Sequence, residues 1–286
     1  MTSAPFPFSR IGIVGLGLMG GSLARSLRTL PDPPSVVGLS KEPHDIERAM
    51  RMGIIAEGES KPESFFSGLD LVVYCTPLNT TLVLLEEHRD RLDPGTVITD
   101  VVSLKGPVME KAKELGLQRR FVGSHPLCGG EGTGLDASRE GLFTGSTVWV
   151  VAGEAEPATV EVIRGFWRAL GAEGVSTQAE GHDALMAVVS HLPQLAANAL
   201  ALALEEKDVS RDDLGPGGKD MTRLAGSSPE MWMDLLAHSP SDLRDGLASL
   251  ERWLAEIRGL VEEGRGEELQ RLMARTQDWF KRTRWN

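Results

Sequence analysis

Several residue types are scarce in this 286-residue chain, and each scarcity excludes a class of protein. The two cysteines, Cys75 and Cys128, are too few and too far apart for a disulfide framework or a cysteine-based metal site. No run of about eighteen uncharged apolar residues occurs, and the opening "MTSAPFPFSR" lacks the apolar core of a signal peptide. We therefore expect a soluble protein of the reducing cytoplasm, with no membrane as a partner.

Positive charge is also scarce. Lysine and arginine together number 30 against 41 acidic residues, which gives a formal net charge of −11. Because an acidic surface repels phosphate, this balance argues against nucleic acid or an anionic membrane as the main partner. An anionic substrate would need a site that is locally positive.

Patterns typical of metal sites are absent from the sequence, which has neither HExxH nor paired cysteines. His182 and His191 are nine residues apart, about 900° around an α-helix, so they point to opposite faces unless the helix breaks. We therefore expect no metal, and a buried structural role is the default for each of these histidines.

Short apolar, β-branched runs alternate with helical stretches as far as residue 177. This alternation predicts a doubly wound (Rossmann-type), mostly parallel α/β sheet whose strands are buried on both faces. The expected strands cover 10–16, 35–40, 70–76, 96–101, 120–124, 147–152 and 173–177, and the expected helices lie near 18–30, 43–52, 79–92, 105–116 and 157–171.

From residue 178 the strand signal stops and helical periodicity replaces it, which predicts two domains, 1–177 and 178–286. The stretch 180–206 is apolar enough for a largely buried helix, and Pro193 should kink or loosen it beside His191. Further helices are expected over 227–236, 243–264 and 267–285. The apolar character of this all-α domain suggests that it forms a homodimer.

The segment "IGIVGLGLMGG" places Gly15, Gly17 and Gly20 in GxGxxG spacing, directly after a strand and at the start of a helix. In this context the glycines serve a tight turn, close approach of a pyrophosphate, and packing of helix against strand. Leu18 and Met19 open the helix, whose N-terminal amides favour phosphate. The segment predicts a nicotinamide dinucleotide site.

The choice between NAD and NADP is read at the end of the second strand, where the sequence is "GLSKE". Ser40 and Lys41 offer a hydroxyl and a cation where NAD-specific sites usually carry an acidic residue, which slightly favours NADP. Glu42 follows directly, so NAD stays open. Thr76 and Pro77 end the third strand at the ligand-binding edge of the sheet, and we expect them to contact the cofactor.

Polar side chains in three further segments are candidates for a substrate site. Ser103, in "TDVVSLKG", either caps the next helix or takes part in the chemistry, and the two roles are compatible. His125 lies in the glycine-rich loop "GSHPLCGGEG". Arg223 lies in "GPGGKDMTRLAGSSPEMW", and its planar guanidinium suits a carboxylate.

Taken in order, the segments "IVGLGLMGGSLARSL", "TDVVSLKG", "FVGSHPLCGGEGTGLDASREGLF", "SHLPQLAANAL" and "DMTRLAGSSPEMWMDLL" resemble the prephenate/arogenate dehydrogenase family of tyrosine biosynthesis. The likeness runs from about residue 10 to residue 280. It implies oxidative decarboxylation of prephenate to 4-hydroxyphenylpyruvate, or of arogenate to tyrosine, with hydride transfer to NAD or NADP.

The resemblance also implies roles for individual residues. By position, His125 would be the catalytic histidine that draws the proton of the substrate 4-hydroxyl, and Ser103 would orient it. Arg223 would bind a substrate carboxylate, and His191 would help to hold the substrate side chain. Further pocket positions of the family fall on Lys219, Asp220, Glu131 and Trp232.

Some features depart from the family pattern or leave alternatives open. The segment before Arg223 reads "GPGGKD", where many members have an aromatic residue and an arginine. We expect neither a regulatory domain nor a chorismate mutase segment, so tyrosine feedback would act at the active site. A β-hydroxyacid dehydrogenase is disfavoured because no lysine occurs between Lys113 and Lys207, and a non-catalytic dinucleotide sensor would not need His125 and Arg223.

Overall fold

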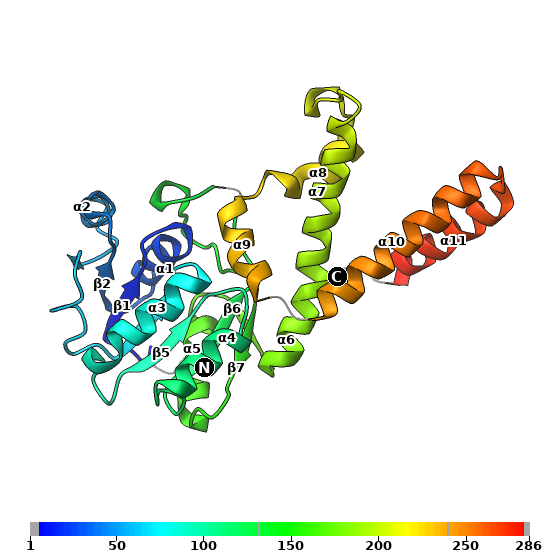
Figure 1. Cartoon of the computed structure of the whole chain (residues 1–286). Helices are drawn as coiled ribbons and strands as arrows, with labels where there is room; N and C mark the ends of the chain where they lie inside the picture. Colours follow the sequence, from blue (N-terminus) through cyan, green and yellow to red (C-terminus); the bar gives the residue numbers. More distant parts are fainter. Residues whose placement is uncertain (1–5, 131, 239–240, 283–286) are drawn as a thin grey trace.

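The computed structural model describes residues 6–130, 132–238 and 241–282. An eight-stranded sheet has the order β3-β2-β1-β4-β5-β6-β7-β8, and all neighbouring pairs are parallel except β6 with β7. The predicted doubly wound α/β fold followed by a helical domain is confirmed (Figure 1). The strands are β1 Arg10–Val14, β2 Ser35–Leu39, β3 Glu57–Glu59, β4 Leu71–Tyr74, β5 Val97–Asp100, β6 Phe121–Pro126, β7 Thr147–Val151 and β8 Glu173–Thr177.

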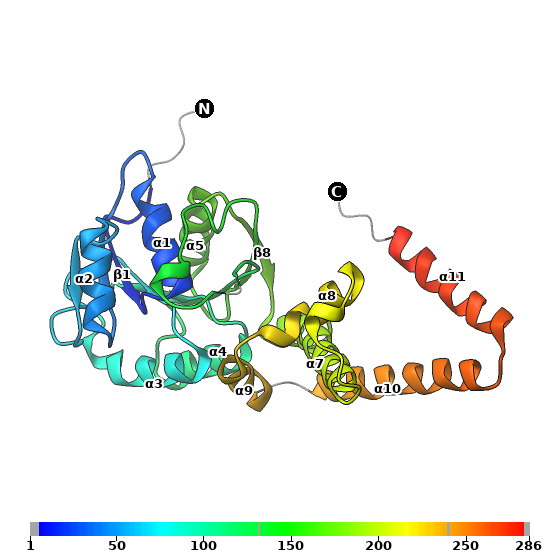
Figure 2. The same cartoon turned by 90° about the horizontal axis from the view of Figure 1, so that it is seen from above.

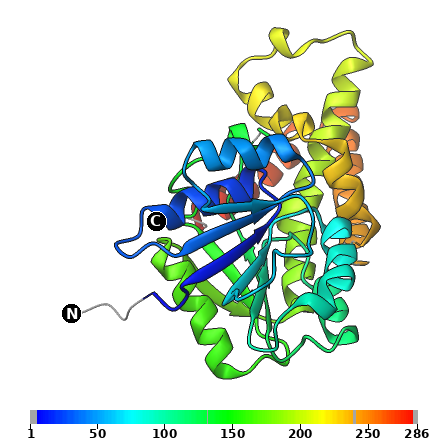
Figure 3. The same ribbon diagram turned by 90° about the vertical axis from the view of Figure 1, so that its left-hand side faces the viewer.

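Helices cover both faces of the sheet, as Figure 3 shows with the strands between two helical layers. One apolar core joins the sheet to α1 (Leu18–Arg28), α2 (Pro43–Arg51) and α5 (Pro157–Ala169). The other joins it to α3 (Leu78–His88) and α4 (Gly106–Glu114), and also takes in Leu235 of α9 (Pro229–Ala237). Helix α9 therefore connects the helical domain to the core of the first domain.

The helical domain begins with α6 (Ala179–Met186), a π-helical segment (Ala187–His191) and α7 (Leu192–Glu205). Pro193 lies in the first turn of α7 and cannot donate to a preceding carbonyl, which explains why regular α-helix fails just before it. The predicted loosening beside His191 is thus present. The rest is α8 (Pro216–Thr222), α9, α10 (Ser241–Glu262) and α11 (Gly266–Arg282), the last two forming an arm that extends away from the sheet (Figure 2).

The expectation of a largely buried helix over 180–206 is wrong for the single chain. Val188, Val189 and Leu202 on this stretch are mostly exposed, because no part of the described chain packs on that face. By length and composition alone, 179–205 could cross a membrane. However, four polar residues of this stretch, His182, Asp183, His191 and Gln194, are buried against the protein, which is what a core-facing helix requires.

Candidate active site

The glycine turn between β1 and α1 has the shape that a dinucleotide pyrophosphate needs. Gly15 has a φ of 95°, and a Cβ on Gly20 would lie 1.9 Å from the Gly15 carbonyl oxygen, so both positions require glycine. A Cβ on Gly17 would meet nothing within 4 Å, which leaves open space above the first turn of α1. No side chain caps that helix start, and its amides are available to a phosphate.

A cavity of about 1060 Å³ extends from this turn to the helical domain. Its lining includes Leu18, Met19, Thr76 and Pro77 from the predicted cofactor positions. It also includes Ser103 and Arg223 from the predicted substrate positions, but not His125. The structure therefore places the first residues of α1, Ser103 and Arg223 around one space.

Ser40 and Lys41 lie just beyond the end of β2. The Ser40 side chain is nearly buried, and its hydroxyl accepts a hydrogen bond from the Glu42 amide at 3.2 Å. The Lys41 side chain is 91% exposed, and its Nζ lies 3.9 Å from a Glu42 carboxylate oxygen. A loose surface pair of this kind leaves the lysine able to turn toward another anion.

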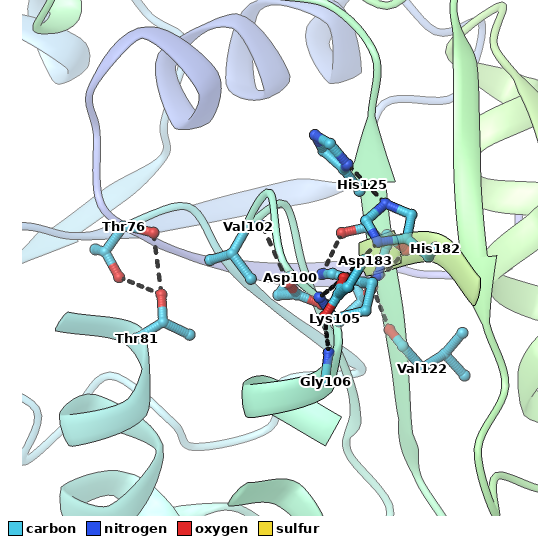
Figure 4. Close-up of polar contacts among 12 residues, drawn as sticks. Thr76, Thr81, Asp100, Val102, Lys105, Gly106, Val122, His125, His182 and Asp183 are labelled. Carbon is cyan, nitrogen blue, oxygen red and sulfur yellow. Dashed lines mark hydrogen bonds and ion pairs between the residues drawn. The ribbon is translucent and has the colours of Figure 1, made fainter. Parts of the chain in front are cut away.

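His125 ends a chain of hydrogen bonds that crosses from the sheet to the helical domain (Figure 4). Its Nδ1 lies 2.9 Å from Nε2 of His182, and Nδ1 of His182 lies 2.7 Å from Oδ1 of Asp183. His125 lies on β6 opposite Trp149 of β7, whereas His182 and Asp183 lie on α6. Three polar residues from two domains are thus linked in a row.

The surroundings of His125 favour its neutral form. Burial lowers the pKa of His125 well below its usual value, and the nearby positive charge of Lys105 and the rings of His182 and His191 lower it further. Burial likewise lowers the pKa of His191. A histidine that is neutral at pH 7 can accept a proton, which is the requirement for a general base.

A buried ion pair holds the backbone just before His125. The Lys105 ammonium is paired with Asp100 and donates to the Ser124 carbonyl at 2.7 Å. Asp100 in turn accepts from the Ser124 amide at 3.0 Å. The residue preceding His125 is therefore held at both its amide and its carbonyl, which restricts the direction of the imidazole.

Ser103 does not cap the next helix, contrary to one of the two roles considered for it. Helix α4 begins at Gly106. The amides of Lys105 and Gly106 donate to the Asp183 carboxylate at 2.8 and 2.7 Å. The cap comes from α6, and Ser103 lines the cavity instead.

Of the remaining predicted substrate residues, those that the structure describes lie in the helical domain. Trp232 packs edge-on against His191, with ring centroids 5.6 Å apart, and its buried indole nitrogen has no hydrogen-bond partner within the described chain. Lys219 and Asp220 are exposed on α8 and do not line the cavity. Glu131 lies outside the described residues.

Comparison with known proteins decides the family. The family model described as "Prephenate dehydrogenase, nucleotide-binding domain" matches residues 23–176, and "Prephenate dehydrogenase, dimerization domain" matches residues 178–275. The chain belongs to the prephenate dehydrogenase family. The match covers both domains, as the resemblance in the sequence had indicated.

Relatives and solved structures of this family agree over most of the chain. A prephenate dehydrogenase from Bacillus subtilis is 31% identical over 93% of this chain and 74% of its own length. A cyclohexadienyl dehydrogenase from Zymomonas mobilis is 29% identical over 88% and 87%. The structure of an Aquifex aeolicus prephenate dehydrogenase with hydroxyphenyl propionate and NAD+ has a TM-score of 0.89 at 28% identity, covering 98% of this chain and all of that one.

A wider set of dehydrogenases shares only the fold. A 3-hydroxyisobutyrate dehydrogenase from Salmonella typhimurium has a TM-score of 0.59 at 15% identity. The shared fold explains why the sequence left a β-hydroxyacid dehydrogenase open as an alternative. The match to the prephenate dehydrogenase family models argues against that alternative.

Sequence reasoning missed His182, Asp183 and Lys105 as parts of the site. The rotation argument placed His182 and His191 on opposite faces of a regular helix, but the π-helical segment intervenes and both rings influence His125. A usable signal was present in the sequence. Asp183 is a charged residue at the start of an apolar run, and such a residue has to find a partner when it is buried.

Proposed function

We propose that this protein oxidatively decarboxylates prephenate to 4-hydroxyphenylpyruvate with a nicotinamide dinucleotide as hydride acceptor, a step of tyrosine biosynthesis. The observation that carries the proposal is His125, whose pKa burial lowers and whose Nδ1 is hydrogen-bonded to His182, in a structure whose main cavity joins the start of α1 to Ser103 and Arg223. Family membership supplies the substrate class.

Each residue has a distinct task in this proposal. Arg223 binds a carboxylate of the substrate, which a protein of charge −11 can do only through such a local cation. His125 accepts the proton of the ring hydroxyl as that carbon becomes carbonyl-like, and returns a proton to the oxygen when the ring becomes aromatic. Ser103 hydrogen-bonds the same hydroxyl and keeps it facing the histidine.

The dinucleotide fits the residues around the glycine turn. Gly15, Gly17 and Gly20 with the first amides of α1 would hold its pyrophosphate, and Thr76 and Pro77 would flank it. When bound, it supplies the hydride acceptor. The departing carbon dioxide leaves an aromatic ring, so the protein mainly has to orient the hydroxyl and the carboxylates.

The first experiment is a steady-state assay with prephenate and arogenate, each with NAD and NADP. Turnover of prephenate with release of carbon dioxide supports the proposal, and failure of all four pairs refutes it. A faster reaction with arogenate would make the protein an arogenate dehydrogenase, the activity named for a Synechocystis structure with a TM-score of 0.80 at 26% identity, covering 96% of this chain and 99% of that one.

Two substitutions separate the tasks of binding and chemistry. His125→Asn should lower kcat by about 10²-fold or more with little change in KM, because it removes the proton acceptor. Arg223→Ala should raise KM by about 10-fold or more through loss of a charged hydrogen bond. Arg244→Ala, at an exposed arginine of α10, is the matched control and should behave as wild type. Reversed effects would exchange the two roles.

NADP is the proposed preferred cofactor. The support is Lys41, a cation at the end of β2 that is held only by a 3.9 Å contact with Glu42. NADP should exceed NAD in kcat/KM, and Lys41→Ala should lower the NADP value about 10-fold while sparing the NAD value. Lys61→Ala, at another exposed lysine, serves as control. A wild-type preference for NAD would refute this assignment.

A homodimer formed through the helical domain is also proposed. Val261 of α10 is 62% exposed in the single chain, and Val188, Val189 and Leu202 are exposed on the first helices of the domain. Light scattering at micromolar concentration should give twice the chain mass of 30.9 kDa. Val261→Glu should reduce that mass, whereas Val83→Glu, at a similarly exposed valine of α3, should not. A monomeric wild type would overturn the proposal.

A cytoplasmic location is proposed as well. Cys75 and Cys128 are both free, which is the usual state of thiols in a reducing compartment. Cell fractionation with a membrane marker and a cytosolic marker tests it.

A further inference from the structure

His182 and Asp183 extend the site behind His125. The imidazole of His182 is fully buried, and both of its nitrogens are in hydrogen bonds, one to His125 and one to Asp183. Packing alone would not require a histidine here, because a phenyl ring would fill a similar volume at no cost in buried polar atoms. A buried imidazole with both nitrogens occupied indicates that its polarity is used.

Asp183 is positioned to act only as an acceptor. Its Oδ1 accepts from the Lys105 amide and faces His182, and its Oδ2 accepts from the Gly106 amide. An ionised carboxylate has lone pairs for all three contacts, so it can accept both backbone N–H groups and a proton donated by His182. A Cβ on Gly106 would lie 3.0 Å from Oδ2, so the absence of a side chain there permits this close approach.

We infer that His182 and Asp183 are positioning residues that hold His125 in one tautomer, with Nε2 free to accept the proton of the substrate hydroxyl. The tautomers are assigned by following the hydrogen bonds from Asp183 through His182 to His125. Asp183 accepts, so Nδ1 of His182 carries the proton and its Nε2 is an acceptor. Nδ1 of His125 must then carry a proton and donate to it, which leaves Nε2 of His125 with a free lone pair.

The same row of hydrogen bonds stabilises the imidazolium that forms when His125 takes up the proton. The titratable groups facing His125 are Lys105 from the loop before α4 and the rings of His182 and His191, and a positive charge on any of them opposes its protonation. Asp183 supplies a negative charge to this group through His182. The inference rests on the proposed function, since it defines how the proposed base is oriented.

The tautomer can be measured directly in the wild-type protein. With ¹⁵N- and ¹³C-labelled histidine, NMR shifts distinguish an Nδ1–H from an Nε2–H imidazole, and the His125 signal is assigned by its loss in His125→Asn. The expected result is the Nδ1–H form in the protein without substrate. An Nε2–H form would overturn the inference, whatever the enzyme assays show, because this measurement does not depend on turnover.

Kinetics of two variants test the consequence for the reaction. His182→Phe preserves a ring of similar size and removes the hydrogen bond, and Asp183→Asn removes the charge. Both should lower kcat by about 10- to 100-fold with KM changed less than about 3-fold. His88→Gln, at a buried histidine that ends α3 and is hydrogen-bonded to Tyr74, controls for loss of a core imidazole and should leave kcat unchanged.

The pH profile separates positioning from general damage to the fold. Without the Asp183 charge, protonation of His125 becomes less favourable, so the acid limb of kcat/KM should move to lower pH in Asp183→Asn. Damage to the fold would lower activity without moving the limb. If Asp183→Asn keeps the acid limb of kcat/KM at its wild-type pH and a kcat within 3-fold of wild type, the inference is overturned. If the wild-type protein itself shows no turnover, the proposed function is refuted instead.

Discussion

Substituting alanine for Gly17 and for Gly20 should separate cofactor binding from folding. At Gly17 an added Cβ meets no atom within 4 Å, and the φ of −76° suits alanine. Loss of a good N-cap residue costs about 0.5–1 kcal/mol, and the reduced entropy of the unfolded chain returns about 0.4–1 kcal/mol. The free energy of unfolding should therefore change by less than about 0.5 kcal/mol.

Binding should respond in the opposite way. The open space above Gly17 is where the pyrophosphate approaches the backbone, and a methyl group there should weaken dinucleotide affinity at least about 10-fold, or 1.4 kcal/mol. Gly20→Ala places a Cβ 1.9 Å from the Gly15 carbonyl oxygen, so the start of α1 has to move, at a cost of about 1–3 kcal/mol in stability.

The assays are urea unfolding and calorimetric titration with NAD and NADP. Gly17→Ala should keep the wild-type unfolding midpoint and lose affinity, and Gly20→Ala should lose both. Wild-type affinity in Gly17→Ala would refute the argument, because it would show that no phosphate comes near that Cα atom.

Three further predictions concern titratable side chains in or near the core. Burial lowers the pKa of His88 from 6.5 to about 4, so the unfolded chain binds the proton first and stability falls as the pH drops from 6.5 to 4. The stability difference between wild type and His88→Gln should shrink by about 3 kcal/mol over this range in urea unfolding, and a constant difference would contradict the assignment. Lys105→Met leaves the Asp100 carboxylate buried without its partner and should cost about 3–5 kcal/mol, part of which the double variant with Asp100→Asn should restore; equal stabilities of single and double variants would argue against the pair. Burial raises the pKa of the half-buried Cys75 thiol, so alkylation of Cys75 at pH 8 should be slow in the native protein and fast in urea when followed by mass spectrometry, and equal rates would show that the pKa is not raised.

The fold was predictable from the sequence because its signals are local. Apolar strands alternating with helices predicted every strand except β3, whose sequence Glu-Gly-Glu carries no apolar pattern and which depends on its pairing with β2. Helix α8 was also missed, because it is short and contains two glycines that read as a loop. Both exceptions are elements that their neighbours stabilise more than their own residues do.

The site was predictable only where a motif carried it. The glycine turn and the segments around His125 and Arg223 have distinctive spacing, and the structure brings Ser103 and Arg223 to one cavity with Leu18 and Met19, which follow that turn. The role of Asp183 depends on contacts with residues 77 and 78 positions earlier in the chain, and no local pattern encodes such contacts. The reading of Ser103 as a helix cap failed for the same reason, since the cap arrives from a distant helix.

The capping of α4 by Asp183 makes the two domains depend on each other for activity. A fragment ending with the sheet would keep the glycine turn and His125, but it would lack both the partner of that histidine and the cap of α4. It could acquire a dinucleotide and still have no oriented base. A displacement of α6 away from the sheet would likewise separate His182 from His125 and remove the cap of α4, so proton transfer depends on contacts that neither domain can make alone.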